Sequence, residues 1–523
     1  MIRFVKILLL IVGLYAPVYA HEVVELKMPG SNKVVIKFMF RNGSITDPAG
    51  KEGLTRLTTS LLTDGGTKNL TQQQITDIIY PWAAYYYSST DKEVTIVTFE
   101  VPLVFLDKFY PIIRDLMLTP SFSQSDFDRV KSNQQNYVDE VIRSSSDEEY
   151  SKKALEDMLF RGTNYQHLTS GTSNGIKSIT LNDVKEHYKK YFTWHNLTLG
   201  IAGDYPATFL AKLNMDIKTL PMVKPVIPVA GKSARLEGIN VEIISKENAL
   251  GSAIFGGFPM NITRSNDDFA ALMIANSWMG EHRKSYSRLY QKLREARSMN
   301  YGDYTYIEWY ESGGTNMLPS PGVPRSSNYF SFWVRPVQTA KGLKGQYPEL
   351  SNISIGHAHF ALRMVKRELD QLIKNGLNKE DFELTKEFLR SYIKLYAQSP
   401  GKQLGYLLDS KFYGRKNYLA EMDKLLEKTT LSDVNSAIRK YWQTNNMDIV
   451  IVTDTSEADA LAKSLQTGNV SPMAYSNSLK ASLEASILEE DRVVENYNFP
   501  VKSVKIVGSD KVFISTSIIA GSK

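Results

Sequence analysis

One feature of the sequence constrains the fold more than any other, an internal duplication. The segment 181–204 (LNDVKEHYKKYFTWHNLTLGIAGD) aligns without gaps to 431–454 (LSDVNSAIRKYWQTNNMDIVIVTD), and eight of the 24 positions are identical. A second pair of segments, 126–138 and 381–393, repeats in the same order at nearly the same offset. A repeat of this length indicates two copies of one structural unit rather than one large domain.

Both copies predict the same local structure. Thr180 and Thr430 each precede an aspartate by three residues. This spacing is typical of a helix start, because the hydroxyl accepts a free backbone N–H and the carboxylate favours the helix N-terminus. A turn and a short apolar strand follow each predicted helix, at 197–202 and 447–452.

A proline-rich stretch, 221–237, separates the two copies and is predicted to be an interdomain linker. The chain therefore divides into an N-terminal half, 22–220, and a C-terminal half, 238–510, with a short tail at 511–523. The sequence leaves the role of the C-terminal stretch 455–523 open.

Within each half, strands come first and helices dominate the rest. A strand pair opens each half, 23–28 with 34–41 and 241–245 with 252–258, and a further strand is predicted at 501–507. Hairpin-linked strands followed by runs of helices predict an α+β fold, in which each half is an antiparallel sheet with helices packed on it.

Residues 1–20 have the pattern of a secretory signal peptide. Arg3 and Lys6 supply the charged start, an apolar run begins at Ile7, and small or modest residues precede His21. The apolar run is short for a bilayer-spanning helix, so an uncleaved membrane anchor is the less favoured alternative.

Composition narrows the expected location and partners. The chain has no cysteine, so disulfides cannot stabilise an exported form and a cysteine-anchored lipoprotein is excluded. After signal removal we expect a soluble, periplasmic or otherwise exported protein that does not insert into a membrane. The net charge of +6 is spread over 523 residues without a dense basic run, which argues against nucleic acid as a partner.

The common hydrolytic motifs are absent from the sequence. There is no H-E-x-x-H, no G-x-S-x-G and no Walker A loop. His357 and His359 form one close histidine pair, but in a helix this spacing places the rings on different faces, which suits a solvated helix start better than a metal. We expect no metal and no cofactor in this chain.

Residues 53–62 (GLTRLTTSLL), followed by Gly65-Gly66-Thr67, are similar to the first helix of the insulinase/pitrilysin-type zinc peptidases. That helix carries an inverted H-x-x-E-H motif in the context G-L-x-H-x-x-E-H-x-L. The resemblance covers nearly all of the mature chain. It implies two similar α+β halves that face each other like a clamshell.

The differences from the family pattern fall on the zinc site. Arg56 and Ser60 stand at the two histidine positions, Thr59 stands at the general-base position, and Tyr137 matches the third ligand. A one-residue slip of the alignment would bring Asp139 or Glu140 to that place, but a lone carboxylate does not hold zinc. Without the metal there is no Lewis acid and no activated water, so we expect no zinc hydrolysis by this chain alone.

The second half matches the family at a different site. Residues 287–304 (SRLYQKLREARSMNYGDY) resemble S-R-L-x-x-x-L-R-E-x-x-G-x-x-Y, with Ser298 where glycine is common. The resemblance implies that Arg294 and Tyr301 reach into the clamshell and bind substrate near the scissile bond. Arg297, one turn beyond Arg294, has no family role and is expected to tolerate substitution.

The residues themselves are compatible with this role but do not require it. Leu289, Leu293 and Ala296 lie on one predicted helix face, so Arg294 points away from the buried side. Arginine and a phenol hydroxyl can both donate to a peptide carbonyl or its oxyanion. The alternative is a surface salt bridge for Arg294 and a packed strand residue for Tyr301.

A third segment bears on peptide binding. Residues 80–89 (YPWAAYYYSS) are aromatic and polar. In the family the matching strand pairs with extended substrate through its backbone, a mode that recognises main chain rather than sequence. A packed aromatic strand is the alternative.

These observations favour a non-catalytic, substrate-binding subunit of a two-chain zinc peptidase. A zinc-bearing homologous subunit would be its partner, and peptides or unfolded polypeptides its substrates. The main alternative is an inactive homologue acting as a structural or peptide-binding scaffold. An independent enzyme with an unrelated site is a further alternative.

Overall fold

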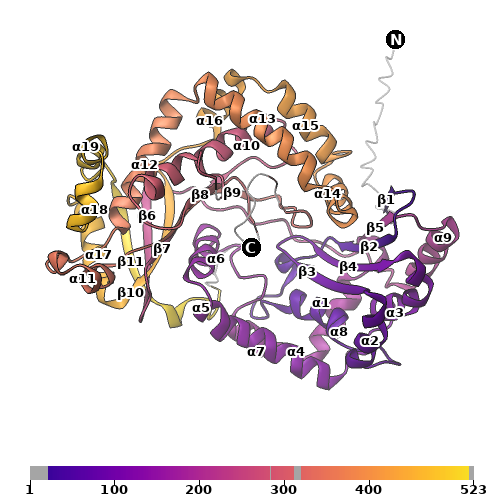
Figure 1. The fold of residues 1–523 in the computed structure, drawn as a ribbon. Helices are drawn as coiled ribbons and strands as arrows, with labels where there is room; N and C mark the ends of the chain where they lie inside the picture. The colour runs from indigo at the N-terminus through magenta and orange to yellow at the C-terminus, as the bar shows by residue number, and fades with distance from the viewer. Residues whose placement is uncertain (1–21, 283, 311–317, 319, 517–523) are drawn as a thin grey trace, which may run out of the picture.

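The protein consists of two α+β halves that face each other, each with a sheet and a layer of helices on its outer side (Figure 1). The computed structural model describes residues 22–516 apart from 283, 311–317 and 319. The predicted signal peptide, 1–20, lies outside the described residues. The α+β fold with two similar halves in a clamshell arrangement is confirmed.

The two sheets share one order of five strands, and the second has β11 in addition at one edge. The first sheet runs β1-β5-β2-β4-β3 and the second β11-β6-β10-β7-β9-β8. The strands of the first are β1 (Glu22–Lys27), β2 (Lys33–Phe40), β3 (Tyr85–Thr90), β4 (Thr95–Pro102) and β5 (Leu197–Gly203). Those of the second are β6 (Ile239–Lys246), β7 (Ser252–Met260), β8 (Asp303–Tyr306), β9 (Asn328–Val337), β10 (Met447–Asp454) and β11 (Val501–Gly508).

Nineteen α-helices are found among the described residues. The first half contains α1 (Leu54–Thr63), α2 (Gln72–Ile79), α3 (Leu106–Leu118), α4 (Gln124–Asn136), α5 (Ile142–Ser144), α6 (Asp147–Leu159), α7 (Ser173–Ser178), α8 (Leu181–Tyr191) and α9 (Ala207–Asp216). The second contains α10 (Asp268–Gly280), α11 (Ala340–Gln346), α12 (Ala358–Asn375), α13 (Lys379–Tyr396), α14 (Pro400–Phe412), α15 (Tyr418–Lys428), α16 (Leu431–Tyr441), α17 (Thr455–Thr467), α18 (Asn477–Ser482) and α19 (Ala485–Val494).

The expected opening strand pairs are wrong, and each sheet is mixed rather than purely antiparallel. β5 lies between β1 and β2 and is parallel to β1, and β10 lies between β6 and β7 and is parallel to β6. Every residue of β5 and of β10 is buried, whereas β1 is largely exposed or half-buried. A strand that is apolar on both faces belongs in the centre of a sheet, so the last strand of each repeat takes the central place.

The duplication extends to single hydrogen bonds. At α8 the Thr180 hydroxyl accepts from the Asp183 N–H at 3.2 Å, and the Asp183 carboxylate accepts from the Thr180 N–H at 2.8 Å. At α16 the same bonds join Thr430 and Asp433 at 3.2 and 2.9 Å. The predicted helix starts are therefore confirmed as a pair of capping boxes.

The C-terminal stretch belongs to both halves. β11 adds a parallel strand beside β6, as the predicted strand at 501–507 suggested, and α17 lies against it. The chain then returns to the first half, where the carbonyls of Phe513 and Ile514 accept from the N–H groups of Ser173 and Asn174 at 3.0 and 2.9 Å. This last segment ties the end of the chain to the N-terminal half.

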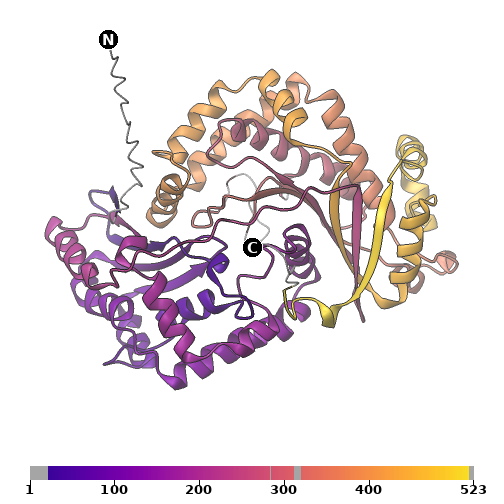
Figure 2. The same ribbon diagram turned by 180° about the vertical axis from the view of Figure 1, so that it is seen from behind.

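Each half also places one of its helices against the sheet of the other half. α6, from the first half, lies on the inner face of the second sheet, and α14, from the second half, lies on the inner face of the first (Figures 1 and 2). One shared core therefore joins residues of α6 to the inner face of β7 and β10: Tyr150, Ala154, Leu155, Leu159, Phe255, Val450 and Val452. As domain boundaries, 22–220 and 238–510 stay a prediction, since each range completes the core of the other.

The contact of α14 with the first sheet depends on a glycine. Leu404 and Leu408 of α14 pack with apolar side chains of β2 and β5. A Cβ atom at Gly200 of β5 would lie 3.1 Å from a methyl carbon of each leucine. The helix can therefore approach the sheet closely only because this position has no side chain.

Both exchanged helices carry a buried carboxylate at the same place, the tenth residue of a 13-residue helix. Glu156 of α6 accepts from Arg325 Nη1 at 2.7 Å and from Lys92 Nζ at 2.7 Å. Asp409 of α14 accepts from Arg264 Nη1 at 2.9 Å. Removing one partner of such a buried pair typically costs about 3–5 kcal/mol, so these contacts fix where each helix sits.

The exchanged helices predict how the protein responds to a cut between its halves. Residues 221–237 form neither helix nor strand, and the side chains of Val226 and Val229 are 83% and 88% exposed. Limited proteolysis should cut in this linker, yet the two fragments should stay together because two shared cores join them. Gel filtration under native conditions, followed by denaturing electrophoresis, checks this. Fragments that elute separately without denaturant would contradict it.

Candidate functional site

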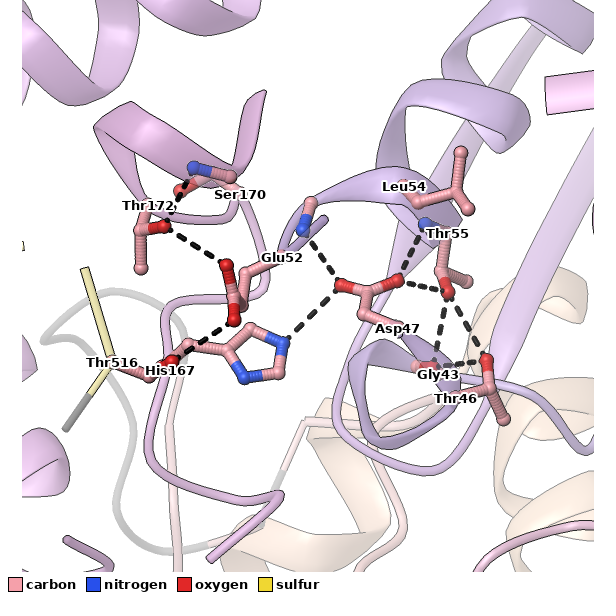
Figure 3. A network of polar contacts seen from close by, with 12 residues as sticks. Gly43, Thr46, Asp47, Glu52, Leu54, Thr55, His167, Ser170, Thr172 and Thr516 are labelled. Carbon is pink, nitrogen blue, oxygen red and sulfur yellow. Dashed lines mark hydrogen bonds and ion pairs between the residues drawn. The ribbon is translucent and has the colours of Figure 1, made fainter. Parts of the chain in front are cut away.

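The helix that matches the family's zinc helix, α1, begins at a buried carboxylate (Figure 3). Asp47 accepts from the N–H groups of Gly53 and Thr55, both at 2.7 Å, and from the Thr55 hydroxyl at 2.6 Å. His167 Nε2 lies 3.2 Å from the same carboxylate. Because the free N–H groups of a helix start need acceptors, Asp47 fixes where α1 begins.

A second carboxylate anchors the loop before α1. Glu52 accepts from the hydroxyls of Thr172 and Thr516 at 3.2 and 2.9 Å (Figure 3). It also accepts from the Gly50 N–H at 2.9 Å. Thr516 belongs to the C-terminal segment that returns to the first half. The start of α1 is therefore held by residues from three distant parts of the chain.

On α1, the positions of the zinc motif are occupied by structural side chains. Thr59, at the general-base position, is 1% exposed, and its hydroxyl donates to the Thr55 carbonyl at 2.7 Å. Ser60 and Arg56 are half-buried. A hydroxyl held by its own helix in the core cannot act on a water, so α1 keeps the shape of the site but not its chemistry.

The structure brings Arg56 and Tyr137 together, as the alignment predicts for two positions of one site. The Arg56 guanidinium carbon lies 5.8 Å from the centre of the Tyr137 ring. Tyr137 opens a π-helical turn, Tyr137–Val141. Such turns are rare and are often found at functional sites. A cation–aromatic contact now occupies the place where the resemblance puts a metal.

No group of three or more histidine, aspartate or glutamate side chains is placed to hold a metal in the part of the chain that the structure describes. Asp139 accepts from Gln135 at 2.7 Å, and Glu140 is exposed. The histidines of GHAHF are not on a solvated helix start as expected, because His357 and His359 are 3% and 0% exposed. Burial lowers the pKa of both, that of His359 to about 3.

The second predicted site lies on another π-helical turn, Tyr290–Glu295. The structure brings Arg294 and Tyr301 together, since Arg294 Nη1 donates to the Tyr301 carbonyl at 2.8 Å and the guanidinium carbon lies 5.6 Å from the Tyr301 ring. Ser298 between them has φ of 50°, a left-handed conformation that favours glycine. This explains why glycine is common at that position in the family pattern.

The π-helical turn changes which residues are buried. Leu289 and Leu293 are 0% exposed, as predicted, but Ala296 is only half-buried and Arg297 is 0% exposed. Arg297 pairs with Asp491 at 2.7 Å and with Glu490 at 2.9 Å. The expectation that Arg297 tolerates substitution is therefore wrong, because a wider helical turn rotated it into the core.

Arg294 and Tyr301 remain available for a ligand. Tyr301 is 74% exposed, and in the described part of the chain no carboxylate pairs with Arg294. The neighbouring Gly302 carbonyl accepts from the Arg335 N–H at 3.3 Å, and Arg335 Nε donates to Glu148 of α6 at 2.9 Å. The site therefore adjoins the first turn of α6, at the junction of the two halves.

The segment 80–89 contains the edge strand β3, which is bonded only to β4 among the described strands. Tyr86 packs into the outer core against Phe99, whereas Tyr85 and Tyr87 are each 45% exposed on the other face. The Ser88 hydroxyl lies 3.0 Å from that of Thr63 at the end of α1. One face of β3 is therefore packed and the other is exposed. The strand runs beside α1, the helix that matches the family's zinc helix.

Two sets of buried polar side chains escaped prediction. Asp47 and His167 lie far apart in the sequence and meet only in the fold, so no local pattern identifies them. Lys37 could have been noticed in the sequence, since it is a charged residue inside an otherwise apolar strand (KVVIKFMF) whose other charge, Lys33, stands at the first position.

Comparison with known families matches both halves. The family model described as insulinase (peptidase family M16) matches residues 22–173, and the one described as peptidase M16 inactive domain matches residues 178–389. The non-peptidase homolog YmxG of Helicobacter pylori is 21% identical over 433 residues, which are 80% of this chain and 88% of that protein.

Solved structures share the fold. A peptidase M16 inactive domain from Pseudomonas fluorescens has a TM-score of 0.69 and 18% identity, covering 84% of this chain and 96% of that one. A protease from Helicobacter pylori has a TM-score of 0.67 and 15% identity, covering 83% and 97%. At these identities the likeness concerns the fold alone.

The residues at the zinc positions predict that the mature chain holds no stoichiometric zinc. A guanidinium at one ligand position and hydroxyls at the others do not supply the nitrogen and carboxylate donors that zinc needs. Elemental analysis after purification without chelator checks this, with a zinc-bearing homologue purified in parallel as the control. A tightly held zinc in every chain would contradict it.

The burial of Arg297 predicts a contrast with Arg294. Arg297→Ala leaves the buried Asp491 carboxylate without its cation, whereas Glu490 keeps Lys292 and Arg367, and it should lower the free energy of unfolding by about 3–5 kcal/mol. Arg294→Ala removes no ion pair and should change it by less than about 0.5 kcal/mol. Urea unfolding of both variants decides this, and equal effects would contradict the assignment of the two roles.

Proposed function

Because the chain belongs to the insulinase (M16) peptidase family and lacks that family's zinc ligands, we propose that it is the non-catalytic, substrate-binding subunit of an exported two-chain zinc peptidase. A homologous zinc-bearing subunit supplies the metal and the attacking water. This chain completes the peptide-binding chamber. Its substrates are peptides or unfolded polypeptides.

The observation that carries this proposal is that Arg294, beside an exposed Tyr301, has no carboxylate partner among the described residues. Elsewhere in the described chain, buried arginines such as Arg264, Arg297 and Arg325 are held by carboxylates. Arg294 instead donates one hydrogen bond to the Tyr301 carbonyl, and its other N–H groups have no carboxylate partner among the described residues. Its guanidinium and the Tyr301 hydroxyl can donate to a scissile carbonyl as that oxygen gains negative charge.

The edge strand β3 supports peptide binding. Its outer edge has no partner strand among the described residues, so its backbone N–H and C=O groups can bond an extended peptide. Main-chain pairing of this kind accepts many sequences. It suits a subunit that presents unfolded polypeptide to a partner's metal.

Export is part of the proposal. It rests on the signal-peptide pattern of residues 1–20 and on the absence of cysteine from the chain. No helix among the described residues has both the length and the apolar character needed to cross a bilayer. A periplasmic location fits these features.

A scaffold without any role at an active site is the second candidate. The self-contained bonding of Thr59 and the contact of Arg56 with Tyr137 favour it, since a purely structural homologue needs only a stable helix there. A scaffold has no need of Arg294 and Tyr301. The two candidates therefore differ in what those two residues do.

The subunit proposal predicts a specific loss of activity. Arg294→Ala or Tyr301→Phe should reduce the peptidase activity of the reconstituted pair by about 10²–10³, the usual effect of removing one transition-state donor, while folding and association persist. The control is Arg439→Ala, which removes an exposed arginine from the outer surface of α16. If both variants kept full activity in an active complex, the scaffold would become the better account.

A further inference from the structure

The inner face of the first sheet holds a lysine in an apolar setting. Lys37 of β2 is 8% exposed, and Val35 and Met39, which flank it on the same face, are 0% exposed. Both flanking residues pack in the core that α14 covers. A charged group in such a place is costly unless something compensates it, so packing alone does not explain it.

Lys37 has no counter-ion of its own among the described residues. Its Nζ donates to Thr98 Oγ1 at 3.1 Å, and no carboxylate lies within ion-pair distance. Glu100 and Asp409 act on Lys37 from beyond ion-pair distance, and each also pairs directly with another cation, Glu100 with Lys33 and Asp409 with Arg264. Burial lowers the pKa of Lys37 to about 8, against the opposing effect of these two carboxylates.

The strand register leads from Lys37 to the edge strand β3. Strand register places Gly200, Lys37, Thr98 and Tyr87 in one row across β5, β2, β4 and β3. α14 covers the row at Gly200, and Tyr87 ends it with 45% exposure. Lys37 therefore lies between the part of the sheet that α14 covers and the exposed tyrosines of β3, Tyr85 and Tyr87.

Tyr85 and Tyr87, beside Lys37, offer exposed ring surface for contact with a ligand. The rings of Tyr85 and Tyr87 stack with centroids 6.3 Å apart and planes at 13°. Lys37 Nζ lies 5.9 Å from the centre of the Tyr87 ring. Half-exposed tyrosines next to an ammonium that makes no direct ion pair among the described residues form a surface that can hold an anion and the apolar stem that carries it.

We propose that Lys37 is an anion-binding point of the peptide chamber and that it binds a carboxylate of the substrate, with Tyr85 and Tyr87 alongside. This inference rests on the proposed peptide-binding function and adds a preference for acidic peptides. A single ammonium matches a carboxylate better than a phosphate, for which several cations or an arginine fork are usual. The carboxylate is that of an acidic side chain or of the peptide C-terminus.

Three labelled peptides that differ only in their carboxylates distinguish binding of an acidic side chain from binding of the peptide C-terminus. One has a central glutamate and an amidated C-terminus, the second has glutamine in its place, and the third has the glutamine with a free C-terminal carboxylate. Fluorescence anisotropy at low salt measures their binding to the mature chain. We expect one carboxylate peptide to bind about tenfold more tightly than the neutral one, the size typical of a charged hydrogen bond.

Lys37→Met should abolish this preference while leaving the affinity for the neutral peptide unchanged. Lys37→Gln, which keeps a donor for Thr98, should do the same and serves if the methionine variant folds poorly. The control is Lys27→Met, an equal change of charge at a residue of β1 that contacts Tyr205 of the outer core. It should keep the preference.

The outcomes separate the subsite from the function on which it rests. Equal binding of all three peptides to the native chain, or an unchanged preference in Lys37→Met, would overturn the Lys37 subsite alone. If no peptide bound the native chain, peptide binding by this chain would be overturned and the subsite with it.

Discussion

The whole structure depends on covering two sheets that are apolar on both faces. Each half covers the outer face of its own sheet with helices, but the inner face needs a helix from the other half. α6 and α14 make this exchange. Glu156 of α6 binds Arg325 across the two halves, whereas Asp409 fixes α14 to Arg264 within the second half. The halves therefore cannot separate without exposing apolar surface and buried charge, and the clamshell is one cooperative unit.

This rigid frame explains how a chain can lose a catalytic site and keep its shape. α1 is held at its start by Asp47 and Glu52, and none of the residues that these carboxylates bond is itself a zinc position. Substitution of the metal ligands therefore removes chemistry without removing the helix. The Arg294–Tyr301 pair depends on a different local feature, the π-helical turn Tyr290–Glu295, which packs against β8 and α12 and not against α1.

Much of the fold follows from the sequence, and the failures have physical causes. The duplication and the threonine caps predicted the two halves and the helix starts, because both are local patterns. The central places of β5 and β10 and the helix exchange were missed, since a buried strand does not reveal which element covers it. The burial of Arg297 was missed because α-helical periodicity was assumed where the chain forms a π-helical turn. The sequence shows Lys37 as a charged residue inside an apolar strand, but only the folded structure shows that it makes no direct ion pair among the described residues.

The central claim is that this chain works with a zinc-bearing homologue. The most direct test is to purify the tagged chain from its native host, identify the proteins that accompany it, and assay the sample for peptidase activity. The account predicts a homologue with an intact H-x-x-E-H motif and an activity that a chelator removes. Recovery of this chain without any such partner, or in an assembly without peptidase activity, would contradict the account.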